Sequence, residues 1–316
     1  MKKKLGAFIV PTGIGASIGG FAGDASNYAR KISEYATLIV NPNVVNAGCF
    51  SGITENMLYV EGFAIDEFFK NNLKLTPSRN NKIGVIFDKA ISQAELNVHI
   101  NTLNAVKTVY GINITEYLIT DEEAGITFTE DGRFSTGFVK NPQTLLKAGR
   151  KLIEQGAEAI AIVCKFEESD SEAYESGFGV DPIGGVEAII SHYLTRELKV
   201  PCAHSPAFEN ITIDTKIVSP KSAAEYITPT FLPCILLGLS NAPKLTQDTG
   251  FSINDLEFLL MPYNALGSIP VFEAQKHNIP VYAIKENKTL LNITDDTIHQ
   301  KCGIIYSYEE FLERLK

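Results

Sequence analysis

"LGAFIVPTGIGASIGGFAGDAS", residues 5–26, joins an apolar run to a glycine-rich turn and to the start of a helical pattern. The run "LGAFIV" has the length and composition of a buried strand. The stretch "DASNYARKISEYA" (24–36) has the spacing of a helix, with Asp24 or Ser26 near its N-cap. A buried strand, a tight turn and a helix in this order are typical of a parallel α/β sheet, with the turn at the carboxyl end of the strand.

The same alternation of apolar runs and helical patterns continues along the chain. We predict strands, mostly parallel, at residues 5–10, 37–41, 83–87, 158–164, 200–204 and 280–285. Residues 125–139 alternate around Asp131-Gly132, which predicts a hairpin. Ser92 and Glu95 form a capping-box pattern at the start of a helix over 92–111. These patterns predict an α/β, Rossmann-like fold with a mainly parallel sheet and helices on both of its faces.

The most polar break between elements is "LKLTPSRNNK", residues 73–82. It suggests a smaller N-terminal α/β lobe, 1–80, which contains the glycine-rich loop, and a larger α/β lobe, 81–316. One continuous domain remains an alternative, because no low-complexity linker separates the two parts.

Composition restricts the class of protein. The chain has 316 residues, 45% of them hydrophobic, which is enough for a large core. The net charge of −9 argues against a general nucleic-acid binder. No run approaches the roughly 18 apolar residues of a membrane span, and the first apolar run is too short for a signal peptide, so we expect a cytoplasmic protein without a membrane partner. The five cysteines are scattered and include no CxxC pair, so we predict that the thiols are reduced and that they form no metal site.

The glycine-rich turn is the first candidate binding site. Its spacing is one residue too long for a dinucleotide fingerprint, and no Gly-Lys-Ser/Thr follows as in a P-loop. Free backbone amides at a helix start can hold a phosphate or carboxylate. The alternative is a tight turn where two backbones cross. The residues assigned to binding are Gly13, Gly15, Ser17, Gly19, Gly20 and Asp24.

A second turn of this kind lies in "GFGVDPIGGVEAIISH", residues 177–192. Asp181, Gly184 and Gly185 precede a helix and are assigned to the same anion site. Glu187 and His192 are five residues apart, so they lie on different faces of that helix and need not cooperate.

Three strand ends carry candidate chemical groups. Cys164 is placed where a catalytic thiol would lie, with a core cysteine as the alternative. His204 is a candidate acid or base, with a structural histidine as the alternative. Glu286 is a candidate catalytic group, and Asn287 and Thr289 are candidate ligands for hydroxyl or amino groups, against a merely polar strand end.

Five long stretches resemble one family: "PTGIGASIGGFAGDA", "GVDPIGGVEAIISHYL", "VPCAHSPA", "TFLPCILLGLSNAP" and "IPVYAIKENKTLL". They are similar to the domain-of-unknown-function family 3326 of cyanobacteria, plants and other bacteria, and they extend over residues 11–291. The resemblance implies an intracellular α/β protein and no particular reaction.

"LLKAGRKLIEQGAEAIAIVC", residues 145–164, is similar to a segment of the aspartate/glutamate racemase superfamily. That superfamily usually has Asn-Thr after the cysteine, whereas Lys165-Phe166 follows here. The second thiol of a racemase would have to be Cys49, which lies in a glycine-rich turn. The resemblance therefore carries over only the placement of Cys164.

We expect an enzyme for a small anionic metabolite, a carboxylate or phosphate, with isomerase, racemase or lyase chemistry and no redox cofactor. The sequence identifies no other cofactor. We expect Cys164, His204 and the Glu286-Asn287 pair to meet at the cleft beside both glycine turns. A non-catalytic nucleotide or metabolite-binding protein is the alternative, and a homo-oligomer with glycines packed between chains also stays open.

Overall fold

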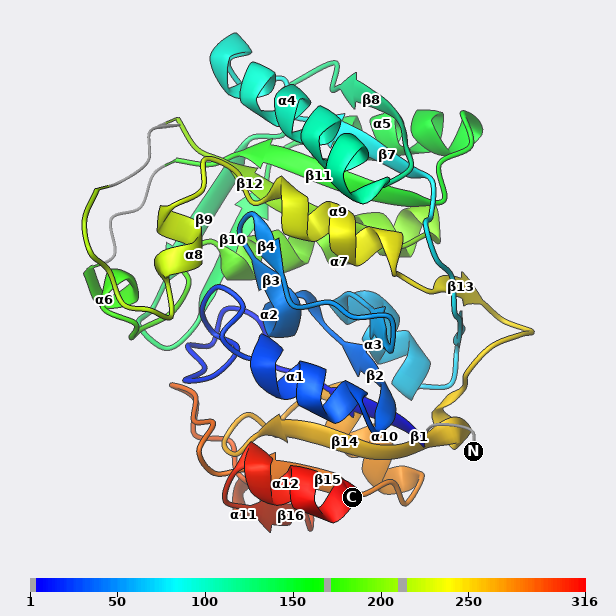
Figure 1. The fold of residues 1–316 in the computed structure, drawn as a ribbon, viewed down its shortest axis with the longest axis vertical. Helices are drawn as coiled ribbons and strands as arrows, with labels where there is room; N and C mark the ends of the chain where they lie inside the picture. The colour runs from blue at the N-terminus through cyan, green and yellow to red at the C-terminus, as the bar shows by residue number, and fades with distance from the viewer. Residues whose placement is uncertain (1–3, 168–171, 210–214) are drawn as a thin grey trace.

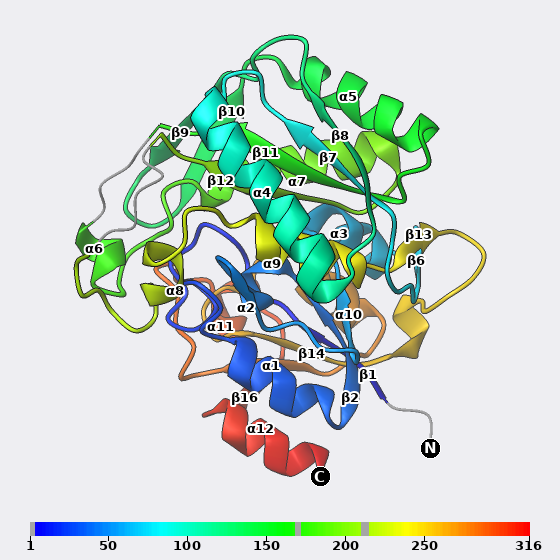
Figure 2. The same cartoon turned by 45° about the horizontal axis from the view of Figure 1, so that its top comes forward.

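The computed structural model describes residues 4–167, 172–209 and 215–316, and it contains two parallel sheets (Figures 1 and 2). The strands of these sheets are β1 (Lys4–Phe8), β2 (Ala36–Val40), β5 (Met57–Tyr59), β7 (Ile83–Phe87), β8 (Ile114–Ile119), β11 (Ala159–Lys165), β12 (Cys202–Ala207), β14 (Leu256–Pro262), β15 (Val281–Ile284) and β16 (Gly303–Ile305). Shorter pairs are formed by β3 (Asn46–Ala47) with β4 (Phe50–Ser51), β6 (Lys74–Thr76) with β13 (Lys244–Thr246), and β9 (Ile126–Glu130) with β10 (Ser135–Val139).

The helices fill the connections between strands. They are α1 (Ser26–Ser33), α2 (Pro42–Val45), α3 (Gly62–Phe69), α4 (Gln93–Tyr110), α5 (Pro142–Glu154), α6 (Glu172–Glu175), α7 (Gly184–Leu198), α8 (Ala223–Tyr226), α9 (Leu232–Ser240), α10 (Ile269–Lys276), α11 (Asp295–Ile298) and α12 (Tyr308–Leu315), with a 3₁₀ turn at Ile253–Asp255.

The first sheet has six strands in the order β16-β15-β14-β1-β2-β5, all parallel. Alternate residues of β1 point to opposite faces, so Leu5 and Ala7 pack with α3 and α10, while Phe8 packs toward α1 and α12. Both faces are therefore covered by helices, which is why the strand is apolar after its exposed first residue, Lys4.

The second sheet has four strands in the order β12-β11-β7-β8, also all parallel. Ile160, Ile162 and Cys164 lie on the face covered by α5 and α7. Ala161 and Val163 lie on the opposite face, covered by α4 and α9. The predicted α/β fold class is confirmed, and so is the prediction that most strands pair in parallel. The predicted hairpin is also confirmed, and it forms between β9 and β10.

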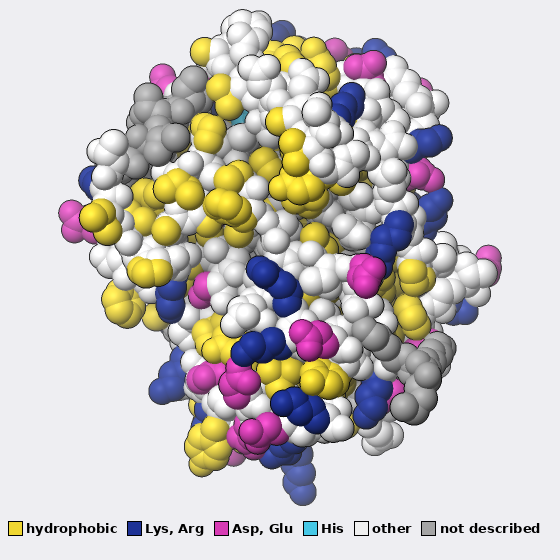
Figure 3. Space-filling model, in the orientation of Figure 1, with side chains coloured by type: hydrophobic (Ala, Val, Ile, Leu, Met, Phe, Trp, Pro, Cys, Tyr) yellow, Lys and Arg dark blue, Asp and Glu magenta, His cyan; other side chains and the backbone are white. Residues whose placement is uncertain are grey.

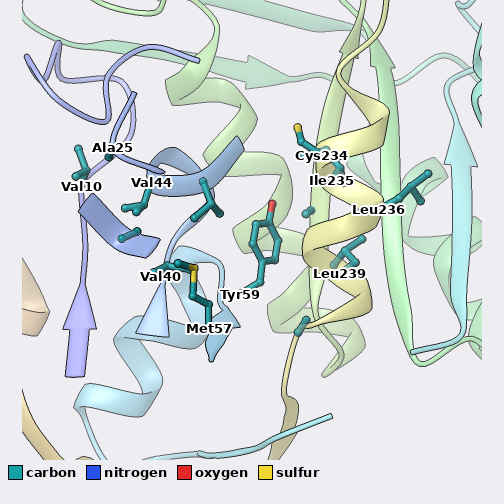
Figure 4. Close-up of a cluster of buried hydrophobic side chains, with 14 of the residues drawn as sticks. Val10, Ala25, Val40, Val44, Met57, Tyr59, Cys234, Ile235, Leu236 and Leu239 are labelled. Atoms are coloured by element: carbon teal, nitrogen blue, oxygen red, sulfur yellow. The ribbon is translucent and has the colours of Figure 1, made fainter. Parts of the chain in front are cut away.

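Helix α9 joins the two sheets into one hydrophobic core. Its side chains Cys234, Ile235, Leu236 and Leu239 share a buried cluster with Val40, Met57 and Tyr59 of the first sheet, and Leu236 points to the opposite side of the helix from Tyr59 (Figure 4). The same core also contains β7 and β11 residues of the second sheet. The two sheets are therefore held in a fixed arrangement by buried apolar contacts, and their carboxyl ends border a shared space.

The strand pairing does not follow the expected division after residue 80. Strands β14, β15 and β16 pair with β1, so the C-terminal part of the chain returns to the first sheet. The chain passes between the sheets near β6 and again near β13, and these two strands pair antiparallel. The boundary near residue 80 matches the first passage, while the residues after β13 belong with the N-terminal strands. Separate folding of the two parts stays a prediction.

Two helix starts illustrate what local sequence can specify. At α4 the predicted capping box is confirmed, because the Glu95 amide donates to Ser92 Oγ at 3.3 Å and the Ser92 amide donates to Glu95 Oε2 at 2.7 Å. At α1, Asp24 and Ser26 lie on either side of the N-cap Ala25, close to where they were predicted, but no side chain caps this helix. Asp24 instead accepts from the Gly19 amide, and the Ser26 hydroxyl donates to a carbonyl of α2.

Candidate functional site

A cavity of about 570 Å³ lies where the two sheets meet. Its wall includes residues just beyond the carboxyl ends of β1, β2 and β5 in the first sheet, residues of β12 in the second, and parts of α7, α8 and α9. Ligands of open α/β sheets bind at this edge. The cavity therefore lies at an edge of the kind where a ligand site was expected, and several of its wall residues differ from those predicted.

His204 lies on this wall between two side chains of α7. Its Nε2 is 2.8 Å from Glu187 Oε1, and its Nδ1 is 2.7 Å from Ser191 Oγ. Glu187 and Ser191 are one helical turn apart, so they flank the imidazole from one helix face. A carboxylate oxygen only accepts hydrogen bonds, so the neutral tautomer that fits both contacts donates from Nε2 to Glu187 and accepts at Nδ1 from the Ser191 hydroxyl. The three side chains form one polarised chain at the cavity.

Two further carboxyl groups on the wall hold protons more tightly than usual. Burial, reinforced by the nearby Glu187 charge, raises the pKa of Asp181 to about 7. Burial and the charge of Asp181 raise the pKa of Glu225 to about 8. The Tyr174 hydroxyl is hydrogen-bonded to the Glu225 carboxyl. Acidic groups crowded into a poorly solvated space favour protonation or a bound cation.

Glu61 and His192 form another acid–base pair on the wall. Glu61 caps α3, since Oε1 accepts from the Ala64 amide at 2.7 Å and Oε2 from the Phe63 amide at 2.9 Å. Burial raises the pKa of Glu61 to about 8 and lowers that of His192. His192 Nε2 is 3.9 Å from Glu61 Oε2. Glu187 and His192 thus have different partners, as their spacing suggested.

In the first glycine-rich turn, three backbone amides of the predicted anion cradle already have hydrogen-bond partners within the protein. The amides of residues 17–19 donate to protein oxygens: Ser17 to the Lys288 carbonyl at 2.7 Å, Ile18 to Asn287 Oδ1 at 3.0 Å and Gly19 to Asp24 Oδ1 at 2.6 Å. The Ser17 hydroxyl donates to the Glu286 carbonyl and accepts from the Lys288 amide. Residues 20–22 still line the cavity, so the turn contributes backbone to the wall rather than an amide nest.

The second turn is occupied in the same way. Asp181 accepts from the amides of Ile183 and Gly184, and Ser135 Oγ accepts from the Gly185 amide at 3.0 Å. A Cβ at Gly185 would lie 2.0 Å from the Ser135 carbonyl oxygen. The glycine is needed because two backbones cross here, which was the structural alternative.

Gly13, at φ +71°, lies at the same crossing, and its carbonyl accepts from the Ser135 amide at 2.8 Å. Gly15, at φ +62°, lies against the Gly179 carbonyl: a Cβ there would be 2.6 Å from that oxygen. Both glycines therefore allow close packing with distant loops.

The expected convergence of Cys164, His204 and Glu286-Asn287 on one cleft is wrong, because only His204 lies on the cavity wall. Cys164 shares a sheet face with His204 but is fully buried, and burial raises the pKa of its thiol well above the ordinary value. Glu286 is exposed and accepts from the Tyr308 amide at 2.6 Å, at the start of α12. An inert core thiol and a helix-capping carboxylate explain these two residues.

Asn287 and Thr289 hold loops in place. Buried Asn287 accepts from the Ile18 amide and donates to the Ile18 carbonyl and to the Tyr308 hydroxyl, both at 2.8 Å. The Thr289 amide donates to Asn264 Oδ1 at 2.7 Å. Neither side chain lies on the described cavity wall. Their polar groups satisfy backbone that would otherwise be buried without partners.

The sequence interpretation missed Glu61, Ser191 and Glu225 and undervalued Glu187. A signal existed for the α7 pair: Glu187 and Ser191 are four residues apart on a helix that leads directly into the strand of His204. Glu61 directly precedes Gly62, the first residue of α3, where an acidic N-cap is common. Glu225 lies in a short helix and gave no comparable signal.

Within residues 4–167, 172–209 and 215–316, no group of three or more His, Cys, Asp or Glu side chains is arranged to hold a metal ion. The five cysteines, all in this described part, are free. Over the same residues, no helix combines the length and the apolar character that a membrane crossing requires.

Comparisons with known proteins extend over almost the whole chain. Residues 6–315 match the family described as "Protein of unknown function (DUF3326)". The chain is 39% identical over 297 residues to a Synechococcus sp. protein named "Uncharacterized lipoprotein", with 90% of this chain and 82% of that protein covered. No solved structure matches. The likeness to the aspartate/glutamate racemase superfamily is not supported. This chain belongs to the family of proteins of unknown function DUF3326.

Proposed function

We propose that the protein is an enzyme for a small molecule, with the Glu187–His204 pair as its acid–base group. The observation that carries the proposal is the hydrogen-bonded chain from Ser191 through His204 to Glu187 on the wall of a cavity. The cavity volume, about 570 Å³, is in the range of small-molecule sites. Isomerisation and elimination both begin with proton removal, so either reaction class fits such a pair.

Glu187 and His204 are suited to sharing a proton. Their side chains are 14% and 13% exposed, so both are largely shielded from water yet open to the cavity. Glu187 takes a proton from the ligand on the carboxylate, and the imidazole N–H stabilises the carboxylate before that transfer. The Ser191 hydroxyl fixes the ring orientation and its tautomer, which is a positioning role.

This proposal does not include the anionic ligand that was expected from the sequence. Several of the turn amides that were expected to bind it, those of Ile18, Gly19 and Gly185 among them, donate to protein oxygens. The cavity wall is also rich in carboxyl groups, which repel an anion. Cytoplasmic location, absence of nucleic-acid partners and homo-oligomerisation stay predictions.

A screen in deuterated water tests the proposal even though the product is unidentified. The intact protein is incubated with a panel of amines, amino acids, hydroxy acids and sugars, and mass spectrometry detects new products or deuterium incorporation. We expect at least one substrate to react, and Glu187→Gln and His204→Gln to lower its rate by about 10²–10⁴-fold. His277→Gln, which changes an exposed histidine, is the matched control.

Calorimetry with the reacting compound separates catalysis from binding. Binding retained in Glu187→Gln with lost turnover supports an acid–base role. If compounds bind the wild type and none of them reacts, the protein is a metabolite-binding protein without catalysis, and the proposal is refuted. Full turnover in both variants also refutes it.

A further inference from the structure

The cavity has an acidic interior. Its described wall carries one lysine and the carboxyl groups of Glu61, Asp66, Glu175, Asp181, Glu187 and Glu225. The lysine, Lys216, lies 3.4 Å from one of these carboxylates, that of Glu175. A ligand with a positive charge would therefore be attracted to this space, and an anion repelled.

Three carboxyl groups of the described cavity wall, those of Asp181, Glu187 and Glu225, act on one another electrostatically. Burial is the main reason why the pKa values of Asp181 and Glu225 are raised and these groups tend to stay protonated, and the charges of the neighbouring carboxylates, Glu187 among them, add to the effect. A bound ammonium group would replace such a proton, because it supplies both the positive charge and several N–H donors. Tyr174, which is bonded to Glu225, adds an aromatic side chain to the same wall.

Two exposed apolar residues, which are not themselves on the wall, are close in sequence to wall residues of the same cavity. Ile227 is 52% exposed and stands between the wall residues Tyr226 and Thr228. Phe50 is 52% exposed and follows the wall residue Gly48 by two positions, and Gly48 lies against Thr228. On the face shown in Figure 3, hydrophobic side chains gather over α8 and the β3–β4 ribbon. This rim suits the apolar part of a ligand whose charged end is inside.

We propose that the ligand is an organic amine, with its cationic nitrogen directed toward the acidic part of the wall at Asp181, Glu187 and Glu225 and its apolar body directed toward Phe50 and Ile227. This inference rests on the proposed function, because it assigns the substrate class of the same cavity. The acidic wall favours a positively charged ligand, and the apolar rim favours an amine with an apolar body over small inorganic cations and polyamines.

Four simple probes test the assignment by calorimetry with the full chain. They are phenethylamine, its neutral analogue 2-phenylethanol, its anionic analogue phenylacetate, and putrescine, a cation without an aromatic body. We expect phenethylamine to bind about tenfold more tightly than 2-phenylethanol and also more tightly than putrescine. Phenylacetate should not bind. Titrations in two buffers of different ionisation enthalpy should show proton release with the amine and none with the alcohol.

Matched variants locate the charged end and the rim. Glu225→Gln should weaken phenethylamine about tenfold and leave 2-phenylethanol unchanged, whereas Glu313→Gln, an exposed control, should change neither. Phe50→Ser should weaken phenethylamine and leave putrescine unchanged. Should Glu225→Gln misfold, Asp181→Asn is expected to show the same discrimination, and circular dichroism checks each fold.

Equal binding of amine and alcohol, preferred binding of phenylacetate, or no binding by any probe would overturn the inference. These binding measurements do not depend on whether the protein converts any compound to a product. Amine binding without any reaction would refute only the proposed enzyme. Turnover of an acidic substrate together with no amine binding would refute only the amine assignment.

Discussion

Glu61 provides a direct test of the electrostatics at the junction between the sheets. Its side chain is 4% exposed, and both of its oxygens accept from backbone amides of α3. Burial raises the pKa of this carboxyl from its ordinary value of 4.5 to about 8. Substitution by glutamine, Glu61→Gln, keeps the size of the side chain and removes the ionisation. The amide can retain the bond from Ala64, while the bond from Phe63 is lost.

The direction of the effect follows from proton linkage. A carboxyl whose folded pKa is raised binds its proton more tightly in the folded state than in the unfolded state. Its contribution to stability is fully present below pH 4.5 and is lost as the pH rises toward 8. At about 1.4 kcal/mol per pKa unit, the difference between the ordinary and the folded-state pKa of Glu61 corresponds to about 5 kcal/mol of stability. Between pH 5 and 8, roughly 4 kcal/mol of this is lost.

Urea unfolding followed by circular dichroism at pH 5, 6, 7 and 8 measures this loss. We expect Glu61→Gln to cost about 1 kcal/mol at pH 5 through the lost hydrogen bond. At pH 8 it should be more stable than the wild type by about 3 kcal/mol, because the wild type must bury an ionised group. Asp181 and Glu225 titrate in both proteins, so their contributions cancel in the difference.

Glu313→Gln, at an exposed position, is the control and should give a curve parallel to that of the wild type. If the curves of Glu61→Gln and the wild type are also parallel from pH 5 to 8, the carboxyl titrates normally. The assigned burial and the raised pKa would then both be wrong.

Three further outcomes follow from packing and hydrogen bonding. Gly185→Ala should lower the free energy of unfolding in urea by about 2–4 kcal/mol, because its Cβ would lie 2.0 Å from a carbonyl oxygen. The control Gly132→Ala, which has open space around it, should lower it by about 1 kcal/mol. Equal losses in the two variants would contradict the backbone crossing at Gly185. Asn287→Ala should cost about 2–4 kcal/mol and expose residues 11–25 to limited proteolysis, whereas unchanged cleavage would show that other bonds hold the loop. Cys164 should react with a thiol reagent only after unfolding, while partly exposed Cys49 reacts in the folded protein; fast labelling of Cys164 would place it outside the core.

Local sequence determined most of the secondary structure. The apolar runs of β1, β7 and β11 and the hairpin of β9 and β10 were evident, because strand and turn patterns depend on residues close together in the chain. The capping box of α4 is local for the same reason: Ser92 and Glu95 are three residues apart. The parallel arrangement also followed, since the strands alternate with helices.

Only the tertiary structure decided which groups meet. The amide of Ile18 finds Asn287, 269 positions away, so the same glycine-rich loop that resembled an anion cradle is closed by its own chain. His204 was recognised, but its position between Glu187 and Ser191 depends on how α7 packs against β12. Long-range hydrogen bonds and strand order are selected by the packing of the whole core, which no short stretch of sequence specifies. For this reason the sequence alone predicted the architecture and, among the polar side chains of the cavity wall, Asp181 and His204, whereas the partners of these two residues depended on the tertiary fold.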